Sequence, residues 1–347
     1  MNKFNIMDVT LRDGSYAINF QFSLAQQRKI IKSLEELGVE YIEIGHGQGL
    51  NASSPKNGVA LHSDEEYLKA AQDTLKKSKY GVFCIPGIAR VEDIEMAKKY
   101  GISFIRVGTN VTDVDKSEPY IRKAKELGLT VMANYMKSQG VTPEYLAKQV
   151  QKSESYGADY VYIVDSAGCM TPNQLEDIYK EIRKVSNIKL GFHGHNNLGI
   201  VLWNCFKAVE LGFDFIDCSL QGMGRSLGNA SLEQFIICCN KLGYKYDCDI
   251  KKLLSVSKQF IYPLVHKLNS IDVMCGATGI HTGYLGTINK VSGKYGVNPL
   301  ELMEQYAKTD QIYMDVDKLE EIAKSMPEDL ESLEVIDLNG YFGYGQY

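Results

Sequence analysis

Short apolar runs alternate with longer amphipathic stretches between residues 5 and 242 of this chain. The apolar runs are rich in Val, Ile, Tyr and Phe and are nearly continuous, which is typical of strands buried on both faces. They occupy residues 5–11, 41–45, 80–85, 104–109, 130–135, 160–165, 189–195 and 215–220. The stretches between them have helical spacing, at residues 24–37, 64–77, 91–100, 116–127, 143–156, 172–185, 199–211 and 231–242.

The ends of the expected helices carry residues that support these boundaries. Thr142-Pro143 and Thr171-Pro172 each place a capping hydroxyl before a proline that suits the first helical turn. Glycine, which favours a left-handed C-terminal cap, follows six of the helical stretches, at positions 38, 101, 128, 157, 212 and 243. Eight repeated strand-helix units predict an α/β fold of the (β/α)8 TIM-barrel type. A doubly wound open sheet is the alternative, but no Gly-x-Gly-x-x-Gly follows the first strand.

The strand-helix repeat stops after the eighth unit. We expect a catalytic barrel over residues 1–245 and a C-terminal helical extension over residues 246–325. Within the extension, residues 249–268 look helical, residues 275–284 look like a glycine-rich turn, and two or three further helical runs follow. Residues 326–347 have no assignment; their aromatic and glycine-rich end, residues 339–347, could be a docking segment or a disordered end.

Composition narrows the classes of partner. The 347-residue chain has a formal net charge of −5, which argues against nucleic acid and anionic membranes as partners. It has no apolar run long enough to span a bilayer and no signal-peptide pattern, so we expect a cytoplasmic protein. Its eight cysteines include no Cys-x-x-Cys pair, which favours reduced, buried thiols over disulfides.

The candidate chemistry centres on His193-Gly194-His195 at the end of the seventh strand. Side chains two residues apart on a strand point to the same face, so the two imidazoles form a potential pair of metal ligands. The first strand ends in Arg12-Asp13, and the working residues of such barrels gather at the carboxyl ends of the strands. Asp13 would complete a mixed nitrogen and oxygen set suited to a divalent transition ion. Two partly exposed histidines and a surface ion pair remain the simpler alternative.

Arg12 would place a fixed positive charge beside such a metal, where it could stabilise an enolate oxygen. Other strand ends also carry polar groups, any of which could be a structural cap or a ligand contact. They lie at Glu43, His46 and Gln48, at Asp165 and Ser166, and between Gln221 and Asn229.

Several of these segments together resemble a known superfamily. They are Val9 to Gly14, Gly45 to Ser54, Val164 to Ser166, His193 to Leu198, and Gly222 to Ala230. In order and position they are similar to the metal-dependent TIM-barrel aldolases and lyases, the DRE-TIM metallolyases. That group includes 4-hydroxy-2-oxovalerate aldolases, hydroxymethylglutaryl-CoA lyase, and the isopropylmalate and homocitrate synthases. Length, motif order and the segments at 45–54 and 165–168 are most similar to the 4-hydroxy-2-oxovalerate aldolases.

The resemblance implies roles by position. Asp13, His193 and His195 match the divalent metal ligands of the family, Mn being usual and Zn, Co or Mg possible. We expect Asp13 and His193, together with His281, to contact the substrate as well. Asn229 matches a further metal contact of the lyases. Arg12 matches the arginine that stabilises the pyruvate enolate, and Ser166 matches a residue that contacts the carboxylate or keto end of the substrate.

The chain departs from the aldolases at two positions. Tyr16 stands where the aldolases carry a histidine that acts as general base, and His281 stands where they carry a tyrosine. We therefore expect His281, or a water that it orients with Tyr16, to serve as the base from the opposite wall of the site. The alternative is that both are ordinary loop residues and the chemistry has changed.

The resemblance implies a class II pyruvate aldolase that reversibly cleaves a 4-hydroxy-2-oxo acid to pyruvate and an aldehyde. The segment Gly279-Ile280-His281 also resembles the one that carries the catalytic histidine of the isopropylmalate-type synthases, which keeps an acyl-CoA-dependent condensing enzyme open. A non-catalytic barrel is a third alternative. We expect a homodimer. The acylating aldehyde dehydrogenase that docks on such aldolases is a doubtful partner, because residues 326–347 do not resemble their C-terminal end.

Overall fold

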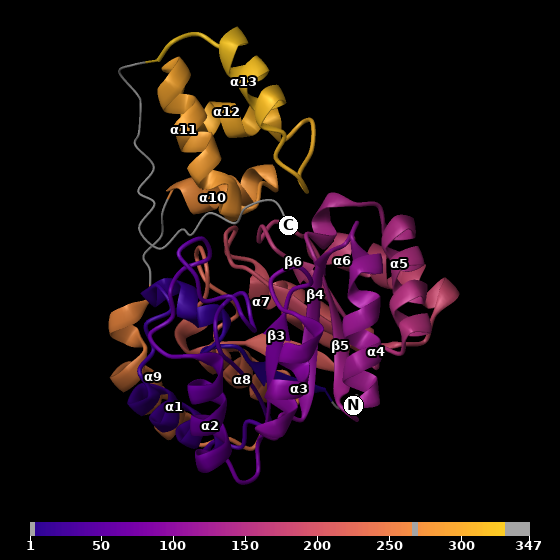
Figure 1. Cartoon of the computed structure of the whole chain (residues 1–347), viewed down its shortest axis with the longest axis vertical. Helices are drawn as coiled ribbons and strands as arrows, with labels where there is room; N and C mark the ends of the chain where they lie inside the picture. The colour runs from indigo at the N-terminus through magenta and orange to yellow at the C-terminus, as the bar shows by residue number, and fades with distance from the viewer. Residues whose placement is uncertain (1–3, 266–269, 330–347) are drawn as a thin grey trace.

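The computed structural model describes residues 4–265 and 270–329 and shows eight parallel strands in a closed barrel (Figure 1). The strands are β1 (Asn5–Asp8), β2 (Tyr41–Ile44), β3 (Lys79–Cys84), β4 (Phe104–Asn110), β5 (Thr130–Met136), β6 (Tyr160–Asp165), β7 (Lys189–Gly194) and β8 (Phe215–Cys218). β1 pairs with β8 in parallel, with Asn5 opposite Phe215 and Asp8 opposite Cys218. This pairing closes the sheet, so the TIM-barrel prediction is confirmed and the open-sheet alternative is wrong.

A helix follows each strand and covers the outside of the barrel (Figure 1). These helices are α1 (Leu24–Glu36), α2 (Asp64–Thr74), α3 (Val91–Lys99), α4 (Glu118–Glu126), α5 (Pro143–Tyr156), α6 (Pro172–Val185), α7 (Val201–Leu211) and α8 (Leu232–Lys241). Thr142 and Thr171 cap α5 and α6 as the sequence predicts, each side chain accepting a hydrogen bond from a backbone N–H of the first turn. Gly157 and Gly212 end α5 and α7 in the left-handed conformation.

Two apolar layers hold the barrel together. The larger layer lies between strands and helices, and a smaller one fills the inside of the barrel. The inner layer consists of Met7, Val9, Phe104, Met132, Tyr162, Val164 and Phe215. Because this interior is filled by side chains, open space for a ligand exists only toward the ends of the strands.

The C-terminal part of the chain contains five more helices in the described residues: α9 (Ile250–Phe260), α10 (Ser270–Thr278), α11 (Leu285–Tyr295), α12 (Pro299–Tyr306) and α13 (Val316–Ser325). α9 packs against α1 and α8 of the barrel. α10 to α13 share a separate apolar cluster that includes Ile288, Leu302 and Leu319. The tail from residue 330 lies outside the described residues.

Two local predictions in this region are wrong. The helix expected over 249–268 ends at Phe260, before Pro263, whose ring and missing N–H disfavour a helix interior; residues 266–268 lie outside the described residues. The turn expected over 275–284 begins only at Gly279, because residues up to Thr278 belong to α10. Gly276 is a packing glycine, since a Cβ there would lie 2.9 Å from the side chain of Leu198.

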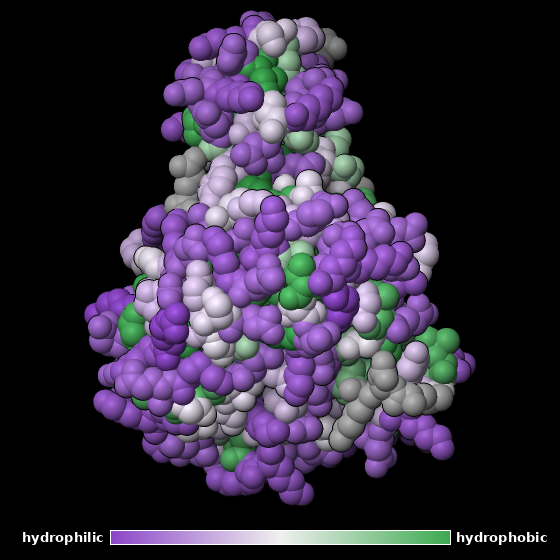
Figure 2. Space-filling view, turned by 90° about the vertical axis from the view of Figure 1, so that its right-hand side faces the viewer, coloured by the Kyte–Doolittle hydropathy of each residue, from purple (hydrophilic) through white to green (hydrophobic). Residues whose placement is uncertain are grey.

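Helices α10 to α13 stand over one end of the barrel, and Figure 1 draws them as a separate group above it. Their contacts identify this end as the carboxyl end of the strands. Tyr313 contacts Thr112 after β4, and the Ile312 carbonyl accepts a hydrogen bond from Lys137 after β5. In Figure 2 the same group forms a narrower upper part, and most of the visible surface is hydrophilic.

Two further expectations concern the membrane and the thiols. No helix in residues 4–265 or 270–329 is both long and apolar enough to cross a bilayer. All eight cysteines are free, and five of them are buried. The eight thiols form no disulfide with one another in the structure, and their reduced state stays a prediction.

Candidate metal centre and active site

Asp13, His193 and His195 lie together at the carboxyl end of the barrel. Asp13 follows β1, and the two histidines come from the end of β7. One potential ligand atom from each residue lies within 4.8 Å of the others. All three side chains are buried, and the two imidazole centroids are 5.2 Å apart. The alternation of side chains along β7 therefore places both imidazoles beside the carboxylate.

Hydrogen bonds leave these groups in the form that binds a cation. His193 Nδ1 lies 2.8 Å from the Asp217 carboxylate, which fixes the proton on Nδ1 and leaves the Nε2 lone pair for a ligand. His195 Nε2 lies 3.4 Å from Arg225 Nη2, and arginine only donates, so Nε2 is the unprotonated nitrogen of this ring and its lone pair accepts from Arg225.

The pKa shifts of Asp13 and His195 also favour cation binding. Burial by itself raises the pKa of Asp13, but the adjacent Arg12 guanidinium outweighs it and holds the pKa well below its usual range. Burial lowers the pKa of His195 to about 3. An ionised carboxylate beside a neutral imidazole is the combination that metal binding requires.

Asn229 supplies a fourth candidate oxygen. Its Nδ2 donates to Asp13 Oδ2 over 2.9 Å, which places the amide next to the three residues. Its buried Oδ1 has no hydrogen-bond partner among the described residues. An unpaired buried carbonyl oxygen is costly unless something binds it, so the donor set fits a divalent cation.

A chain of buried charges supports the ligands from inside the barrel. Arg12 Nε donates to Glu43 over 2.8 Å, and Arg106 donates to the same Glu43 oxygen over 2.8 Å. Arg106 also donates to Asp217 over 2.7 Å, and Asp217 holds His193. The chain thus connects the Asp13 side of the site to the His193 side.

Arg106 and Asp217 were not predicted from the sequence. Each is a charged residue inside an otherwise apolar strand, Phe104-Ile-Arg106-Val and Phe215-Ile-Asp217-Cys. Charged residues are almost never fully buried unless paired, so this pattern could have indicated a buried pair.

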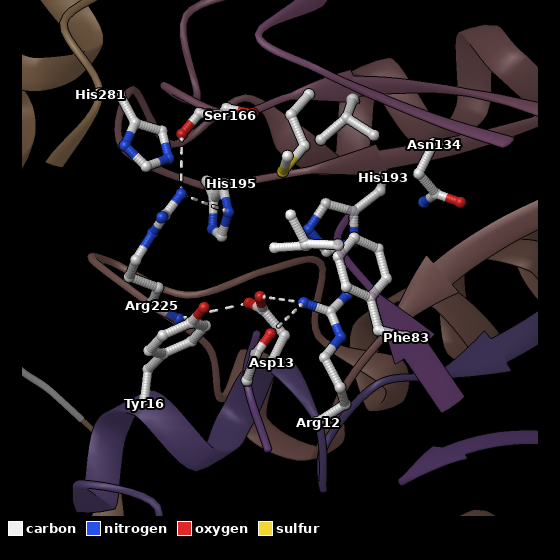
Figure 3. A pocket seen from close by; sticks show the side chains of 14 residues that line it. Arg12, Asp13, Tyr16, Phe83, Asn134, Ser166, His193, His195, Arg225 and His281 are labelled. Carbon is white, nitrogen blue, oxygen red and sulfur yellow. Dashed lines mark hydrogen bonds and ion pairs between the residues drawn. The ribbon is translucent and has the colours of Figure 1, made fainter. Parts of the chain in front are cut away.

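The predicted residues surround one cavity of about 50 Å³, shown in Figure 3. A cavity of this volume has room for a few water molecules or a small acid. Its lining includes Arg12, Asp13, Tyr16, Ser166, His193, His195 and His281. Asn229 does not line the cavity and lies behind Asp13. Arg225 also lines the cavity, although the sequence indicated only that this residue lies in a glycine-rich loop.

Tyr16 and His281 face each other across this cavity, with Arg12 and Asp13 on the Tyr16 side (Figure 3). Both residues therefore line the cavity, and the exchange of their roles stays a prediction. Burial raises the pKa of Tyr16 above its usual range, so the phenol stays protonated. Burial and the nearby Arg225 lower the pKa of His281 well below its usual range, so its imidazole is neutral.

The backbone determines which nitrogen of His281 carries the proton. The Gly283 N–H donates to His281 Nδ1 over 3.0 Å. Since Nδ1 accepts, the neutral ring has its proton on Nε2. In this orientation His281 is a hydrogen-bond donor through Nε2. The prediction that a water oriented by His281 takes the proton therefore fits better than the prediction that His281 itself takes it.

The other polar strand ends have structural roles. His46 stacks on Phe20 with centroids 3.8 Å apart and binds the Gly58 carbonyl through Nε2, away from the cavity. Asp165 accepts hydrogen bonds from the backbone N–H groups of Cys169 and Met170, which fixes the turn after β6.

Comparisons with known proteins agree with this geometry. The sequence pattern of the HMGL-like family matches residues 3–260. The 4-hydroxy-2-oxovalerate aldolase of Carboxydothermus hydrogenoformans is 35% identical over 324 residues, which is 92% of this chain and 96% of that protein. The enzyme of the same name from Moorella thermoacetica is 36% identical over 322 residues, 92% of this chain and 95% of that protein. The solved N-terminal domain of a candidate aldolase from Bacteroides vulgatus is 28% identical with a TM-score of 0.70, covering 80% of this chain and 94% of that one.

Proposed function

Because this chain belongs to the HMGL-like family, we propose that it is a divalent-metal-dependent carbon–carbon lyase that cleaves a 4-hydroxy-2-oxo acid reversibly to pyruvate and an aldehyde. The observation that carries this proposal is the cavity in which Asp13, His193 and His195 meet Arg12, Ser166 and His281. Its size suits a small 2-oxo acid. Its groups are the ones an aldol cleavage uses: a cation site, a guanidinium and polar groups on the opposite wall.

Asp13, His193 and His195 would hold the metal, with Asn229 as a fourth ligand through its unpaired Oδ1. We propose Mn as the ion, with Zn, Co and Mg as alternatives. When bound, the ion supplies a Lewis acid that polarises the 2-oxo group of the substrate.

Arg12 and Ser166 would orient the 2-oxo acid. Two buried carboxylates, Asp13 and Glu43, hold the Arg12 guanidinium at the cavity wall, so its charge needs no reorganisation as negative charge develops on the substrate. The Ser166 Oγ accepts the Lys137 backbone N–H, which leaves its hydroxyl hydrogen for a carboxylate or keto oxygen.

His281 would act at the other end of the substrate. Its Nε2–H would donate to the C4 oxygen, while a hydroxide held between His281 and Tyr16 would accept the proton of the C4 hydroxyl and become water. The bond between C3 and C4 then breaks and its electron pair forms the C2–C3 double bond of a pyruvate enolate beside Arg12, which releases the aldehyde. The water returns a proton to C3 of the enolate, which gives pyruvate and restores the hydroxide. A neutral imidazole that acts as a donor also changes the expected pH profile, because His281 would contribute no ionisation near neutrality.

We propose residues 1–245 as the catalytic barrel and residues 246–325 as an extension that supplies His281. The packing of α9 on the barrel and the separate cluster of α10 to α13 are consistent with an extension in two parts. We further propose a cytoplasmic homodimer, which sedimentation can test. An acylating aldehyde dehydrogenase partner has no support beyond the family resemblance.

The test is proton–deuteron exchange at the pyruvate methyl group, followed by NMR with Mn added. Wild type should exchange, Asp13→Ala should not, and His281→Ala should lose aldol cleavage. His62→Ala is the matched control, since His62 lies outside the cavity and pairs with Glu66. Absence of exchange in Mn-loaded wild type would contradict the proposal, and condensation of acetyl-CoA with a 2-oxo acid would then be the next assay.

A further inference from the structure

Lys137 is the only lysine among the buried residues of the described chain, with 5% of its surface exposed. It follows β5 directly at the carboxyl end of the barrel, one residue after Met136, which lines the cavity. Lys137 itself does not line the cavity. Burying an ammonium or amine has a large desolvation cost, so its contacts call for an explanation.

The side chain of Lys137 ends among groups of the C-terminal extension. Its Nζ donates to Tyr284 Oη over 2.8 Å and to the Ile312 carbonyl over 2.7 Å. It also lies 4.8 Å from the centroid of the Tyr284 ring and 5.7 Å from that of Tyr313. Both aromatic faces favour a cation or a polarised N–H at this place.

These contacts join two separate segments of the extension to the barrel. Tyr284 lies three residues after His281 in the same short turn, and the His281 carbonyl accepts the Tyr284 N–H. Ile312 lies between α12 and α13. One barrel side chain therefore holds both the turn that carries His281 and the loop that packs beside it.

The backbone of Lys137 contacts a second residue of the site, Ser166. Its N–H donates to Ser166 Oγ over 2.9 Å, and its φ of 61° is uncommon for a residue with a side chain. This conformation lets the N–H point toward Ser166 while the side chain points toward Tyr284. Ser166 and His281 are thus positioned through the same residue.

We propose that Lys137 is a positioning residue that fixes the C-terminal extension on the barrel and so places His281 over the cavity. The expected effect of Lys137 on catalysis rests on the proposed function, whereas its expected effect on the docking of the C-terminal extension does not. A lysine in a 2-oxo acid site could instead form a Schiff base with the substrate. The position of Nζ outside the cavity lining argues against that role.

The experiment compares the Mn-loaded wild type with Lys137→Met. Hydrogen exchange of backbone amides in residues 279–314 should become about tenfold faster in the variant, while α5 keeps its protection. The kcat of aldol cleavage should fall about tenfold with KM for the 2-oxo acid changed less than about twofold, because the groups that bind the acid stay in place. Mn content should be unchanged.

Three further variants make the test specific. Lys137→Arg keeps a charged donor and should restore most of the protection and of kcat. Tyr284→Phe removes one acceptor and should give a smaller change in the same direction, which is informative if Lys137→Met does not fold. Lys294→Met is the matched control, because Lys294 pairs with Glu320 inside the extension.

The outcomes separate this proposal from the proposed function. Unchanged exchange in residues 279–314 overturns the positioning role, and so does a reduced kcat without faster exchange. Trapping of a pyruvate adduct on Lys137 by borohydride also overturns it. If wild type shows no lyase activity but Lys137→Met still loosens the extension, the proposed function fails and the positioning role stands.

Discussion

The two walls of the active site are built differently. The wall that carries Arg12, Asp13 and His193 belongs to the barrel strands and is supported by buried ion pairs through Glu43, Arg106 and Asp217. The wall that carries His281 belongs to the extension, whose helices α10 to α13 have their own apolar cluster. Its polar contacts to the barrel include those of Lys137 and the hydrogen bond from Tyr313 to Asp113.

This difference separates two tasks. The barrel wall must hold like charges and metal ligands at fixed distances, and a closed sheet with paired buried charges does so rigidly. The extension wall needs only to bring a donor over the cavity, and a separately packed unit can do so. We therefore expect substitutions in the barrel wall to act on metal binding and folding, and substitutions in the extension wall to act on turnover.

The largest expected effect comes from the metal ligands. Asp13→Ala removes the only carboxylate of the triad and should lower aldol cleavage by about 10⁴-fold, with Mn lost from the purified protein. Elemental analysis measures the Mn content, and the cleavage assay measures the activity. Asp73→Ala, at an exposed ion pair with Lys69, should leave both unchanged. Full Mn content in Asp13→Ala would contradict the ligand assignment.

Arg106→Met tests the buried charges beneath the barrel wall. The substitution leaves Glu43 and Asp217 without their shared partner in a fully buried position and should lower the free energy of unfolding by about 3–5 kcal/mol. Urea denaturation measures the change. Arg122→Met breaks an exposed helix pair with Glu118 and should cost less than about 1 kcal/mol. Equal losses of unfolding free energy in Arg106→Met and Arg122→Met would show that the buried ion pairs of Arg106 contribute little to stability.

Asp217→Asn tests the contact behind His193. Loss of the carboxylate weakens the orientation of the imidazole and should lower Mn affinity about 10–100-fold. Metal titration measures this. Glu43→Gln disturbs the same Arg106 but leaves the hydrogen bond of His193 intact, so its effect on affinity should be smaller. A larger loss of Mn affinity in Glu43→Gln than in Asp217→Asn would mean that Arg12, rather than His193, determines the Mn affinity of the site.

The smallest expected effect is a pH dependence in the extension wall. Burial and the charge of Arg225 lower the pKa of Lys137 to about 7, while Asp310 and Asp113 oppose the shift. Because the unfolded chain keeps the proton up to a higher pH, the penalty for burying Lys137 is fully present below pH 7. It is relieved as pH rises above 7, so stability should increase in this range.

Lys137→Met should remove this contribution. Between pH 7 and pH 9 the wild type should gain about 1–2 kcal/mol of unfolding free energy relative to the variant. Parallel urea denaturation at the two pH values measures it, with Lys294→Met as control. A parallel pH trend in wild type and Lys137→Met would show that Lys137 keeps an ordinary pKa in the folded protein.

The sequence alone determined the barrel and the candidate metal site. Apolar strands at regular spacing, capping residues such as Thr142 and a glycine after six of the helical stretches are local signals, so the element order and the fold class followed from them. Asp13, His193 and His195 were also predictable, because the barrel fold brings strand ends together and strand alternation gives both imidazoles one face. The resemblance added their roles and those of Arg12 and Ser166.

Only the tertiary structure decided how these residues are held. The pairing of Arg106 with Glu43 and Asp217 spans strands far apart in the sequence, so no local pattern specifies it. The proton position on His281 depends on the Gly283 N–H, and the role of Lys137 depends on Tyr284 and Ile312, 147 and 175 positions away. Gly276 looked like a turn residue because close packing, here against Leu198 in the loop between β7 and α7, and a left-handed turn both favour glycine. A sequence fixes which groups are present, whereas burial and partners fix their charge and orientation, and these exist only once distant segments have packed.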